Sequence, residues 1–594
     1  MKEVTLDELI ADVQAKESVT AESSATALMI HNVGMQVLDA ALGGKVVIHT
    51  DYDADGICSA YIMEKTLKQF NPECDVEVLC NDRRNGYGIS PDIEVNTQSR
   101  HIFLDIGSNQ LDLIAEKFGA DSIIIDHHLI EDKTAVNDFI INDMLCNPHA
   151  LNEDDKENAQ YCATGLAYRI FKDRQSLIDT RNYEYNEGIW DTPAPSLPTY
   201  DIKLENGVDI MACIGTATDM VDVLDTHSYN RQIIRNGIEK INNADEQNTD
   251  FMIGHILAQS GIGSEDVTMH DLAFKTGAFL NSASRMSEIT GENGSQRMYN
   301  AFSGGATAKN LYEISCLAQL NQERKSYVQE LQGRDFADFI NEQRFIDDGN
   351  IAVYRLPDNT PSSFCGLIAS KISESTDKAV LCLSYSEEKG SFSGSGRNAE
   401  GNASLKEFLD SIMQTEDGAG LSVAYGGHHN AVGISRISGD DYEKFVSLVN
   451  SHNHELERSS DERVVLRLSP EEILSPETLE KLQQLEPVGT GLKIPPVIIE
   501  GRELRRNQGF LKGRSDWKKI SVRGIDTQIS DWSYSPDMYP QDKKGNIKML
   551  AEVGISAFRG QHIELTAKWD RNFFEERTEE LKSEKKQKNS ITLD

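Results

Sequence analysis

Residues 45–56, KVVIHTDYDADG, place a histidine and three aspartates on alternate positions at the end of an apolar run. In an extended segment, alternate side chains project to the same side, so His49, Asp51, Asp53 and Asp55 would crowd one patch. Carboxylates this close resist ionising together unless a cation lies among them. Gly56 permits a sharp turn into the helix-like ICSAYIMEKTLKQF. The stretch therefore predicts a strand, a turn and a helix beside a bound metal ion.

Other apolar runs in the first half of the chain also end in acidic or small polar residues: HIFLDIGSN (101–109), DSIIIDHH (121–128) and GVDIMACIGTATDMVD (207–222). Short runs rich in Ile and Val, separated by helix-like stretches, predict a parallel sheet with crossover helices. Ligands collect at the carboxyl ends of the strands in such sheets. We therefore expect Asp105, Asp126, His127, His128 and Asp219 to converge with the first stretch on one site.

The donor types of this set favour a particular class of metal. Carboxylates and imidazoles without cysteine suit Mn²⁺ or Mg²⁺ better than a structural zinc. Two divalent ions held close together need a shared carboxylate and several further oxygen or imidazole ligands. Each aspartate alone has a simpler explanation, because an Asp after a strand is often a helix cap. Several acidic sites together with adjacent histidines instead predict a two-metal hydrolase, with Mn²⁺ favoured over Mg²⁺.

Changes of pattern predict several domains in this chain of 594 residues. We expect an α/β metal-binding domain preceded by an acidic helix, then one long helix that connects it to a smaller α/β domain with two glycine-rich turns, SGSGRNAEG and YGGHHNAVG. Short strands such as KIPPVIIEG and HIELTAKWD then predict a β-barrel, followed by a charged tail. The expected boundaries of these five segments are 1–305, 306–345, 346–460, 461–575 and 576–594.

The charge distribution limits how the chain could bind a polyanion. The sequence has 59 basic and 96 acidic residues, a formal net charge of −37, so any nucleic-acid contact must be local. Residues 501–525 carry eight Arg or Lys residues and only two acidic ones. This region predicts a nucleic-acid strip formed by Arg505, Arg506, Phe510, Trp517, Lys518 and Lys519. The alternative is that the two aromatic residues belong to the barrel core.

The remaining composition bears on the location of the protein. The nine cysteines form no CxxC pair, which argues against a disulfide framework or a structural zinc site. The N-terminal segment has no basic region followed by an apolar one, as a signal peptide would, and no run approaches the roughly 20 apolar residues of a membrane span. We therefore expect a cytoplasmic protein without membrane contact.

Four motifs resemble those of the DHH phosphoesterase superfamily: DYDADGICSA, FLDIGSN, IIIDHH and GTATDMVDV. Five further stretches are similar to the pattern of the RecJ single-strand-specific exonucleases with their DHHA1 second domain: NGYG, YCATGLAYRIF, AFLNSASRM, SGSGRNAEG and GGHHNAVG. LEPVGTG at 485–491 is similar to the segment that leads into the RecJ OB-like domain. The resemblance implies a DHH domain, a DHHA1 domain and an OB-like barrel.

The resemblance also implies roles for the metal-site residues. His49, Asp53 and Asp105 would hold one ion, while Asp55, His127 and Asp219 would hold the other together with a bridging Asp105. His128 would contact the scissile phosphate, and Asp51 and Asp126 would orient ligands. No protein nucleophile is needed.

Substrate contacts are expected at three places. The glycine-rich turns expose backbone N–H groups to an anion, at Gly426 and Gly427, with Arg397 and His428 as charged donors. Arg285, with Asn281 one helical turn earlier, resembles a phosphate contact. In NDRRNGYG, Asp82 stands where RecJ sequences usually have Arg, so Arg83 and Arg84 are the basic candidates there.

The function implied is an exonuclease that releases 5′-mononucleotides from single-stranded DNA in the 5′-to-3′ direction, as used in DNA repair and recombination. A single-strand-binding protein or a helicase is a possible partner. One alternative is a DHH/DHHA1 phosphodiesterase for short oligoribonucleotides or cyclic dinucleotides. Another is a non-catalytic replication or repair scaffold, which the complete set of ligand positions disfavours.

Overall fold

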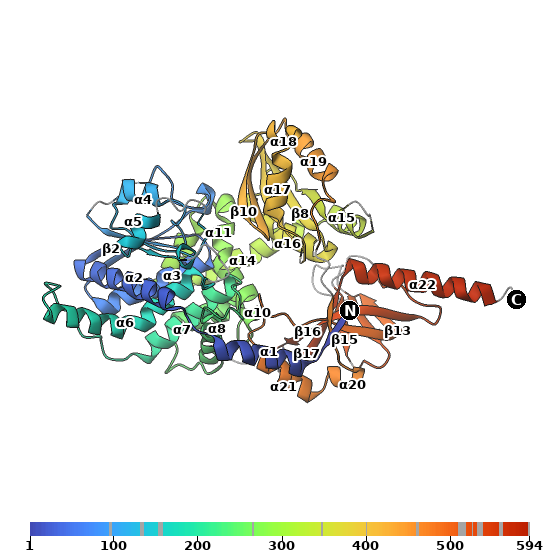
Figure 1. The fold of residues 1–594 in the computed structure, drawn as a ribbon, viewed down its shortest axis with the longest axis horizontal. Coiled ribbons are helices and arrows are strands. Elements are labelled where there is room, and N and C mark those ends of the chain that lie inside the picture. The colour runs from blue at the N-terminus through green and yellow to red at the C-terminus, as the bar shows by residue number, and fades with distance from the viewer. Residues whose placement is uncertain are drawn as a thin grey trace. The chain divides into compact units, whose positions relative to one another are not determined.

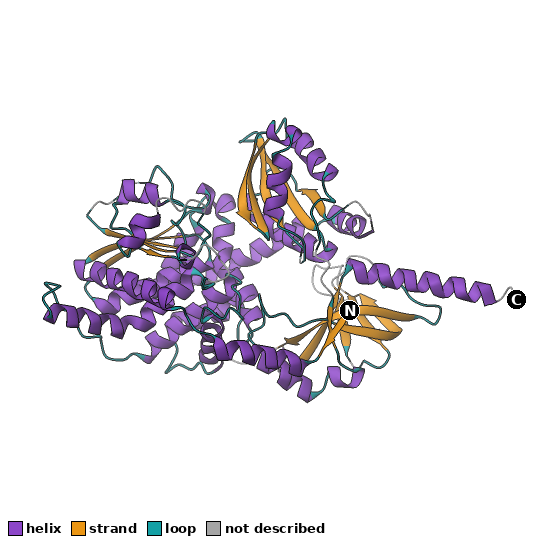
Figure 2. Cartoon of the chain, in the orientation of Figure 1, coloured by secondary structure: helices purple, strands orange, loops and turns teal. Residues whose placement is uncertain are grey.

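The computed structural model describes residues 1–93, 95, 98–130, 136–151, 158–263, 267–345, 349–399, 401–458, 463–508, 518–525, 527–531, 539–556 and 562–591 (Figure 1). The chain forms two compact units. The larger unit comprises Ile10–Arg324 and Gln484–Lys493, and the smaller unit comprises Met1–Leu9, Lys325–Gln483 and Ile494–Asp594. Figure 2 shows strands in both units, with helices packed around the sheet of the larger one. The two units are described separately below.

The larger unit is built on a parallel sheet of five strands in the order β3-β2-β4-β5-β6. The strands are β2 (Lys45–Thr50), β3 (Asp75–Cys80), β4 (Arg100–Leu104), β5 (Ile123–Ile125) and β6 (Leu145–Cys146). The parallel sheet predicted from the sequence is confirmed. Strand β2 lies between β3 and β4, and its apolar residues Val46, Val47 and Ile48 are buried. All five carboxyl ends consequently meet at one edge.

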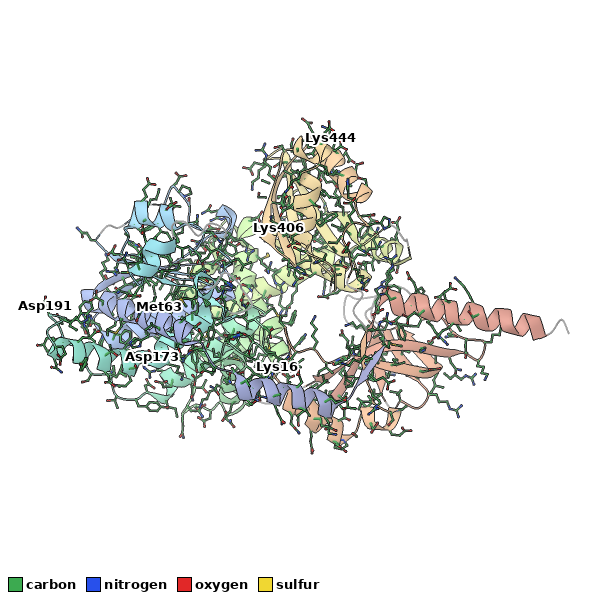
Figure 3. The ribbon with its side chains drawn as sticks, in the orientation of Figure 1. Lys16, Met63, Asp173, Asp191, Lys406 and Lys444 are labelled. Carbon is green, nitrogen blue, oxygen red and sulfur yellow. The ribbon has the colours of Figure 1, made fainter. Side chains whose placement is uncertain are left out.

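The helices that lie wholly within the larger unit are α2 (Ser24–Gly43), α3 (Ala54–Phe70), α4 (Leu111–Phe118), α5 (Val136–Ile141), α6 (Ala163–Asn186), α7 (Ile202–Thr218), α8 (Asn230–Asn242), α9 (Phe251–Ser260), α10 (Met269–Asp271), a π-helix (Leu272–Gly277), α11 (Ala278–Arg285), α12 (Ser287–Thr290) and α13 (Gly294–Ser303). Helices α2, α3, α5, α6 and α13 contact strands of this sheet. Short 3₁₀ turns cover Arg83–Asn85 and Pro148–Ala150. Helix α3 packs against α6 and α7, and its Met63 is fully buried (Figure 3). This packing places the beginnings of α3 and α6 near the carboxyl end of β2.

One of the predicted strand-like runs is wrong. Residues 207–222 were expected to end in a polar strand terminus, but most of the run lies in helix α7. Asp201 caps this helix by accepting from the backbone N–H groups of Lys203 and Leu204, and the helix is buried along most of its length. An apolar run that is buried on all sides has no helical or strand periodicity to distinguish the two structures.

The predicted long connecting helix is interrupted. It consists of α14 (Ala308–Leu331) and α15 (Arg334–Phe345), with Gln332 and Gly333 between them. Glycine in a helix interior costs about 1 kcal/mol relative to alanine, so a break at this residue is the least costly one.

The first sheet of the smaller unit has the order β10-β11-β9-β8-β7. Its strands are β7 (Ile351–Arg355), β8 (Ala379–Ser386), β9 (Ser391–Arg397), β10 (Val423–His428) and β11 (Ala431–Ser438), and its helices are α16 (Ser362–Thr376), α17 (Leu405–Met413), α18 (Glu416–Ala419) and α19 (Tyr442–Ser451). Lys406 of α17 and Lys444 of α19 are labelled in Figure 3. A mixed α/β domain is therefore present here, as predicted.

The two glycine-rich stretches of this sheet were expected to be turns, but all of their glycines except Gly401 lie within strands. Gly394 and Gly396 belong to β9, and Gly426 and Gly427 belong to β10. A Cβ on Gly394 would lie 2.0 Å from the carbonyl oxygen of Cys382, so close strand packing explains this glycine. Among the described residues of these stretches, the chain turns at Gly401, with φ 81°, and between β10 and β11.

The second sheet of the smaller unit contains a closed barrel in the order β13-β14-β15-β17-β16, with β16 pairing back to β13. Its strands are β13 (Val497–Gln508), β14 (Lys518–Val522), β15 (Gln528–Asp531), β16 (Asn546–Ser556) and β17 (His562–Lys568). A five-stranded barrel of this kind is OB-like, which confirms the predicted class. Strand β15 was not among the strands expected from the sequence.

Shorter elements surround the barrel: β1 (Lys2–Val4), α1 (Leu6–Val19), β12 (Val464–Leu466), α20 (Pro470–Ile473), α21 (Pro476–Leu485) and α22 (Arg571–Ile591). Strand β1 extends the barrel sheet by pairing in parallel with β12. The predicted N-terminal helix is therefore preceded by a strand. In the part of the chain that the structure describes, no helix has both the length and the apolar character needed to cross a membrane.

Candidate metal centre

The turn after β2 is built by its own carboxylates. Asp53 is the N-cap of α3, and its side chain accepts from the N–H groups of Asp55 (2.9 Å) and Gly56 (3.2 Å). A Cβ on Gly56 would lie 2.6 Å from the carbonyl oxygen of Asp51, so this close approach requires glycine. Thr50 closes the turn by donating its hydroxyl to the carbonyl of Gly56 (2.6 Å). The motif thus fixes Asp51, Asp53 and Asp55 around one tight turn.

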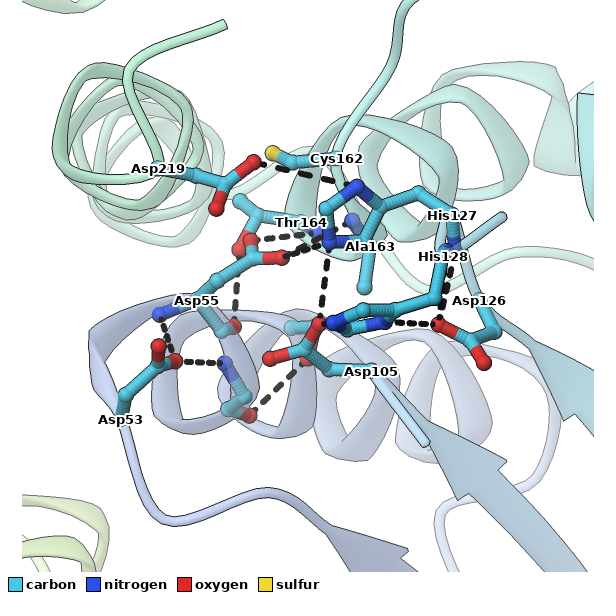
Figure 4. A network of polar contacts seen from close by, with 12 residues as sticks. Asp53, Asp55, Asp105, Asp126, His127, His128, Cys162, Ala163, Thr164 and Asp219 are labelled. Carbon is cyan, nitrogen blue, oxygen red and sulfur yellow. Dashed lines mark hydrogen bonds and ion pairs between the residues drawn. The ribbon is translucent and has the colours of Figure 1, made fainter. Parts of the chain in front are cut away.

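Asp55 is held by the beginning of a second helix. Its two carboxylate oxygens accept from the N–H groups of Ala163 and Thr164, both at 2.9 Å, at the N-terminus of α6. The hydroxyl of Thr164 donates to the Asp55 carbonyl. Free N–H groups at a helix N-terminus stabilise a carboxylate, so α6 positions a buried negative charge in the site (Figure 4).

Asp105 follows β4 with a left-handed backbone, φ 63°. Its Oδ1 lies 3.2 Å from Nε2 of His127 and 3.9 Å from Nδ1 of His128. A non-glycine residue rarely adopts this conformation, and when it does it is often at a functional site. The turn directs the Asp105 carboxylate toward the histidines that follow β5 (Figure 4).

Asp126 holds the histidine pair in place. Its Oδ1 accepts from the N–H groups of His127 (2.7 Å) and His128 (3.2 Å) and lies 2.8 Å from Nδ1 of His128. Its Oδ2 accepts from the N–H of Ser108. Burial raises the pKa of Asp126, but His128 and these hydrogen bonds outweigh it and leave the pKa below its usual value. Asp126 is thus fully engaged in orienting its neighbours.

Within the described part of the chain, three overlapping groups of side chains could each hold a metal ion, because the donor atoms of each group lie within 4.8 Å of one another. The groups are Asp51, Asp53 and Asp105; Asp55, His127 and Asp219; and Asp105, His127 and His128. Asp105 and His127 each belong to two groups. Carboxylate and imidazole donors of this kind suit Mn²⁺ or Mg²⁺, so the residues fit a divalent metal site.

The electrostatics of the site also favour a bound cation. Burial, together with neighbouring carboxylates, raises the pKa values of Asp51, Asp105 and Asp219 well above their usual range. Asp53 is raised for the same two reasons, with Asp55 as the neighbour. Burial and the adjacent His128 lower the pKa of His127 to about 4. The site thus gathers more negative charge than it can ionise by itself, and a divalent ion would relieve this repulsion.

His49 lies apart from these three groups. Its ring is buried, stacks on Phe103 and places Nε2 3.0 Å from Nδ1 of His101. Burial and the nearby His101 lower its pKa to about 3. Among the described residues, Asp51 rather than His49 accompanies Asp53 and Asp105. The predicted ligand role of His49 therefore remains a prediction.

Asp219 reaches the site from a helix end and not from a strand. It is the C-cap residue of α7, and its Oδ2 lies 3.8 Å from Nδ1 of His127. The expected convergence of Asp219 on the histidines is observed, although the element that carries it differs from the expected one.

The basic and amide residues expected near the substrate have defined partners. Asn281 accepts from the N–H of Ala54 at the start of α3 (2.9 Å). Arg83 donates to the hydroxyl of Ser284 (2.8 Å), and its guanidinium lies over the ring of Tyr52. These contacts place Asn281 and Arg83 beside the turn that carries the aspartates.

Arg84 and Arg285 are placed differently. Arg84 forms an ion pair with Asp82 and donates to the carbonyl of Gly291. Its guanidinium therefore already has partners within the protein. Arg285 is the last residue of α11, and its charge helps to oppose the rise in the pKa of Tyr52 that burial and Asp51 cause.

Tyr87 is a residue of the site that the sequence analysis did not single out. Its hydroxyl donates to the carbonyl of Asp105 (3.3 Å) and lies 3.0 Å from Nδ1 of His128. Its side chain is 48% exposed. The signal available in the sequence was its position between two glycines, Gly86 and Gly88. Both glycines have positive φ in the structure, and turns of this kind often hold one side chain in an unusual direction.

Two of the expected anion contacts of the smaller unit, Arg397 and His428, lie in one row of its sheet. Arg397 of β9 and His428 of β10 both pair with Ala431 of β11. Burial lowers the pKa of Arg397, and among the described residues no carboxylate lies within ion-pair distance of its guanidinium. Gly426 has open space where a Cβ would project, and Gly427 has φ 137°. This end of the sheet therefore combines the positive charge of Arg397 with accessible backbone at Gly426.

The predicted nucleic-acid strip is only partly covered by the structure. Arg505 and Arg506 lie in β13 and pair with Ser521 and Ile520 of β14, while Lys518 and Lys519 begin β14. The side chains of Arg505, Arg506 and Lys518, and all of Phe510 and Trp517, lie outside the described residues. The strip therefore stays a prediction.

Comparisons with known proteins agree with this architecture. Residues 45–194 match the family model described as the DHH family, N-terminal domain. Over most of its length the chain is similar to proteins named single-stranded-DNA-specific exonuclease RecJ. The protein from Dickeya dadantii is 22% identical over 549 residues, which cover 89% of this chain and 88% of that protein. The protein from Bacillus subtilis is 23% identical over 503 residues, which cover 82% of this chain but 55% of that protein.

A crystal structure of RecJ in complex with Mn²⁺ from Thermus thermophilus has the same fold. It matches 91% of this chain and 71% of that chain with a TM-score of 0.63 and 18% sequence identity. These matches confirm the resemblance predicted from the motifs: the chain is similar to RecJ proteins over most of its length, and residues 45–194 match the DHH family model.

Proposed function

We propose that the protein is a metal-dependent exonuclease that removes 5′-mononucleotides from single-stranded DNA in the 5′-to-3′ direction. The observation that carries the proposal is the convergence of buried aspartates and a histidine pair at the strand ends of a DHH domain. The relatives that share most of this chain's length are named as single-stranded-DNA-specific exonucleases. Their names supply the substrate class, and the family resemblance supplies the direction.

The residues of the metal centre would have different roles in binding metal ions and in contacting the substrate. When bound, two divalent ions would neutralise the charge that develops on the attacking and leaving oxygens of a phosphodiester. Asp105, which belongs to two of the three donor groups, is the residue best placed to be shared. Asp126 would keep His128 oriented so that its imidazole can donate a hydrogen bond to a phosphate oxygen.

The smaller unit offers features that suit a DNA strand. Arg397 and the glycine backbone of β10 present donors without a competing carboxylate, which is what a phosphate requires. The closed five-stranded barrel belongs to a class that often binds single-stranded nucleic acid. A single-strand-binding protein or a helicase as partner rests on the family resemblance alone.

The test is an end-label assay with purified protein and Mn²⁺. A long single-stranded DNA carries its label at either the 5′ or the 3′ end, and products are resolved over time. We expect immediate release of a labelled mononucleotide from the 5′ end and late loss of the 3′ label. Immediate loss of the 3′ label would contradict the direction, and shortening from neither end would contradict exonuclease activity.

Two further substrates separate the alternatives in the same assay. A short RNA and a cyclic dinucleotide are supplied beside the DNA. Turnover confined to these small substrates would favour a phosphodiesterase for short nucleotides over the proposed exonuclease. Binding of DNA without any turnover would favour a non-catalytic scaffold.

A further inference from the structure

The segment Gln484–Lys493 belongs to the larger unit, although the chain on both sides of it belongs to the smaller one. Two arginines of α8 hold its first residues: Arg235 donates to the carbonyl of Glu486 (3.1 Å), and the buried Arg231 makes more contacts. Arg231 of α8 is 4% exposed and donates to three successive carbonyls, those of Leu485 (2.8 Å), Glu486 (3.2 Å) and Pro487 (2.7 Å). Its remaining donor, Nε, contacts the carboxylate of Glu17. All of the guanidinium nitrogens are thus engaged in fixing this segment.

The other end of the segment contacts the backbone that follows a metal-site residue. The carbonyl of Thr490 accepts from the N–H of Val223 (2.9 Å). Gly491, with φ 81°, lies so close to Asp222 that a Cβ would be 1.7 Å from its Oδ1. Asp222 and Val223 come three and four residues after Asp219. The segment therefore packs directly on the loop that carries Asp219.

A second hydrogen-bonded residue connects this loop to the other side of the metal centre. Asn230, which precedes Arg231, is buried and donates to the carbonyls of Asp222 (3.2 Å) and Gln160 (2.6 Å). Gln160 lies three residues before Ala163, whose N–H group holds Asp55. The start of α8 consequently braces the two backbone stretches that position Asp55 and Asp219.

We propose that Arg231 and the segment 484–493 form a positioning clamp for the metal centre. The clamp fixes the backbone that carries Asp219 and thereby sets the affinity of the donor group Asp55, His127 and Asp219 for a divalent ion. This inference rests on the proposed metal site. Arg231 acts through the backbone and does not touch the ion.

Arginine chemistry explains why lysine would not serve here. The planar guanidinium presents five donors in a fixed fork, which can serve three carbonyls and a carboxylate at once. A lysine ammonium has three donors and no fixed fork, so Arg231→Lys keeps the charge but leaves part of the segment unheld. Loss of residues that orient metal ligands typically lowers metal affinity about 10- to 100-fold.

The test is a Mn²⁺ titration of the full-length Arg231→Lys protein followed by electron paramagnetic resonance, with thermal stability measured beside it. Arg181→Lys is the matched control. Arg181 is 3% exposed and donates to the carbonyl of Thr192 and the carboxylate of Asp39. It lies 18 residues along α6 from Ala163, about 27 Å at 1.5 Å per residue. We expect the Kd of the Mn²⁺ site formed by Asp55, His127 and Asp219 to rise about tenfold in Arg231→Lys. In Arg181→Lys this Kd should stay within about twofold of the wild-type value.

A second pair of variants tests the clamp from the side of the segment, and it decides the matter if Arg231→Lys does not fold. Gly491→Ala forces a Cβ against Asp222, whereas Gly261→Ala introduces the same left-handed strain, φ 91°, where nothing lies within 4 Å. We expect Gly491→Ala to weaken Mn²⁺ binding and Gly261→Ala to leave it unchanged.

Two results would overturn the clamp. One is wild-type Mn²⁺ affinity in both Arg231→Lys and Gly491→Ala, or in Gly491→Ala alone if the arginine variant is unfolded. The other is an equal loss of affinity in the control variants, because binding would then follow general stability. Since the readout is Mn²⁺ binding, these results stand whether or not the chain cleaves DNA, so failure of the proposed function would be recognised separately.

Discussion

The two α/β sheets of this protein both gather functional groups at their strand ends, but they gather opposite charges. The sheet of the larger unit ends in buried carboxylates around Asp105. The row of the smaller unit's sheet that ends β9 and β10 holds Arg397 beside glycine backbone. The first arrangement requires a cation and the second requires an anion. Under the proposed function, divalent metals would meet the first requirement and the phosphates of a DNA strand would meet the second.

The difference arises from how each turn is built. After β2 the chain must turn within three residues, and Gly56 lets Asp53 cap α3 while Asp51 and Asp55 stay buried. In β9 and β10 the glycines stay in the strands and bring backbones close together, so side-chain charge is supplied by Arg397 alone among the described residues of β9. Strand ends are therefore general positions for a site, and the local turn decides which ligand the site takes.

Substitution of Asp105 gives the largest expected effect, because it removes the carboxylate that two donor groups share. Asp105→Asn should lower the rate of single-stranded DNA hydrolysis at least about a thousandfold, since metal ions supply several kcal/mol of transition-state stabilisation. Thermal stability should be kept or raised, because an amide cannot ionise at this buried position among other carboxylates. Asp121→Asn is the control: Asp121 lies before β5, is 63% exposed and pairs with Arg100. Metal-dependent hydrolysis at the wild-type rate in Asp105→Asn would contradict the site.

The stabilising effect of Mn²⁺ should depend on pH. The folded protein without metal keeps protons on Asp51, Asp105 and Asp219 above the pH at which the unfolded chain releases them. Its stability therefore falls as pH rises above about 4, the usual aspartate pKa. Mn²⁺ binds the ionised form. At pH 8 and 100 times its Kd, it should stabilise the protein by about 2.7 kcal/mol, and the same concentration should stabilise it less at pH 5. Equal stabilisation at both values in thermal melts would count against a carboxylate site.

Charge reversal in the barrel tests a third place where the protein could bind DNA, beside the two α/β sheets compared above. Changing Arg505, Arg506, Lys518 and Lys519 together to glutamate should weaken binding of a long single strand by about thirtyfold and reduce its salt dependence. Cleavage of a dinucleotide should change much less. Fluorescence anisotropy and an activity assay measure the two effects, and equal losses on both substrates would mean that this region is structural.

A change at Arg397 tests the positive strand end. Arg397→Lys keeps the charge but loses the guanidinium fork, so KM for single-stranded DNA should rise about tenfold. Mn²⁺ affinity should not change. Arg436→Lys is the control, because Arg436 lies on β11 of the same sheet and is exposed. An unchanged KM in Arg397→Lys would mean that the row of the smaller unit's sheet with Arg397 does not contact the substrate.

Much of this arrangement could be predicted from the sequence because the motifs are local. The turn after β2 and the DHH triplet after β5 both contain their own hydrogen-bond partners, so their geometry depends little on the rest of the chain. Asp219 was expected at the site, but it was expected to follow a strand and instead ends helix α7. An apolar run that is buried on all sides shows neither helical nor strand periodicity, so the sequence could not distinguish the two.

Other features depend on contacts between distant segments. The pairing of His49 with His101 joins two neighbouring strands and directs the ring away from the expected ligand set. The contact of Arg231 with residues 485–487 spans more than 250 positions. Neither contact can be recognised from the spacing of nearby residues. The candidate metal ligands could therefore be predicted from the sequence, but the residues that position these ligands could not.

The most direct test of the central claim is anomalous diffraction from crystals of the protein grown with Mn²⁺. The proposed two-metal centre predicts two peaks about 3.5–4 Å apart at the carboxyl ends of β2, β4 and β5, both beside the carboxylate of Asp105. The same map would show whether His49 or Asp51 completes the group with Asp53. A single peak, or peaks away from Asp105, would contradict the account.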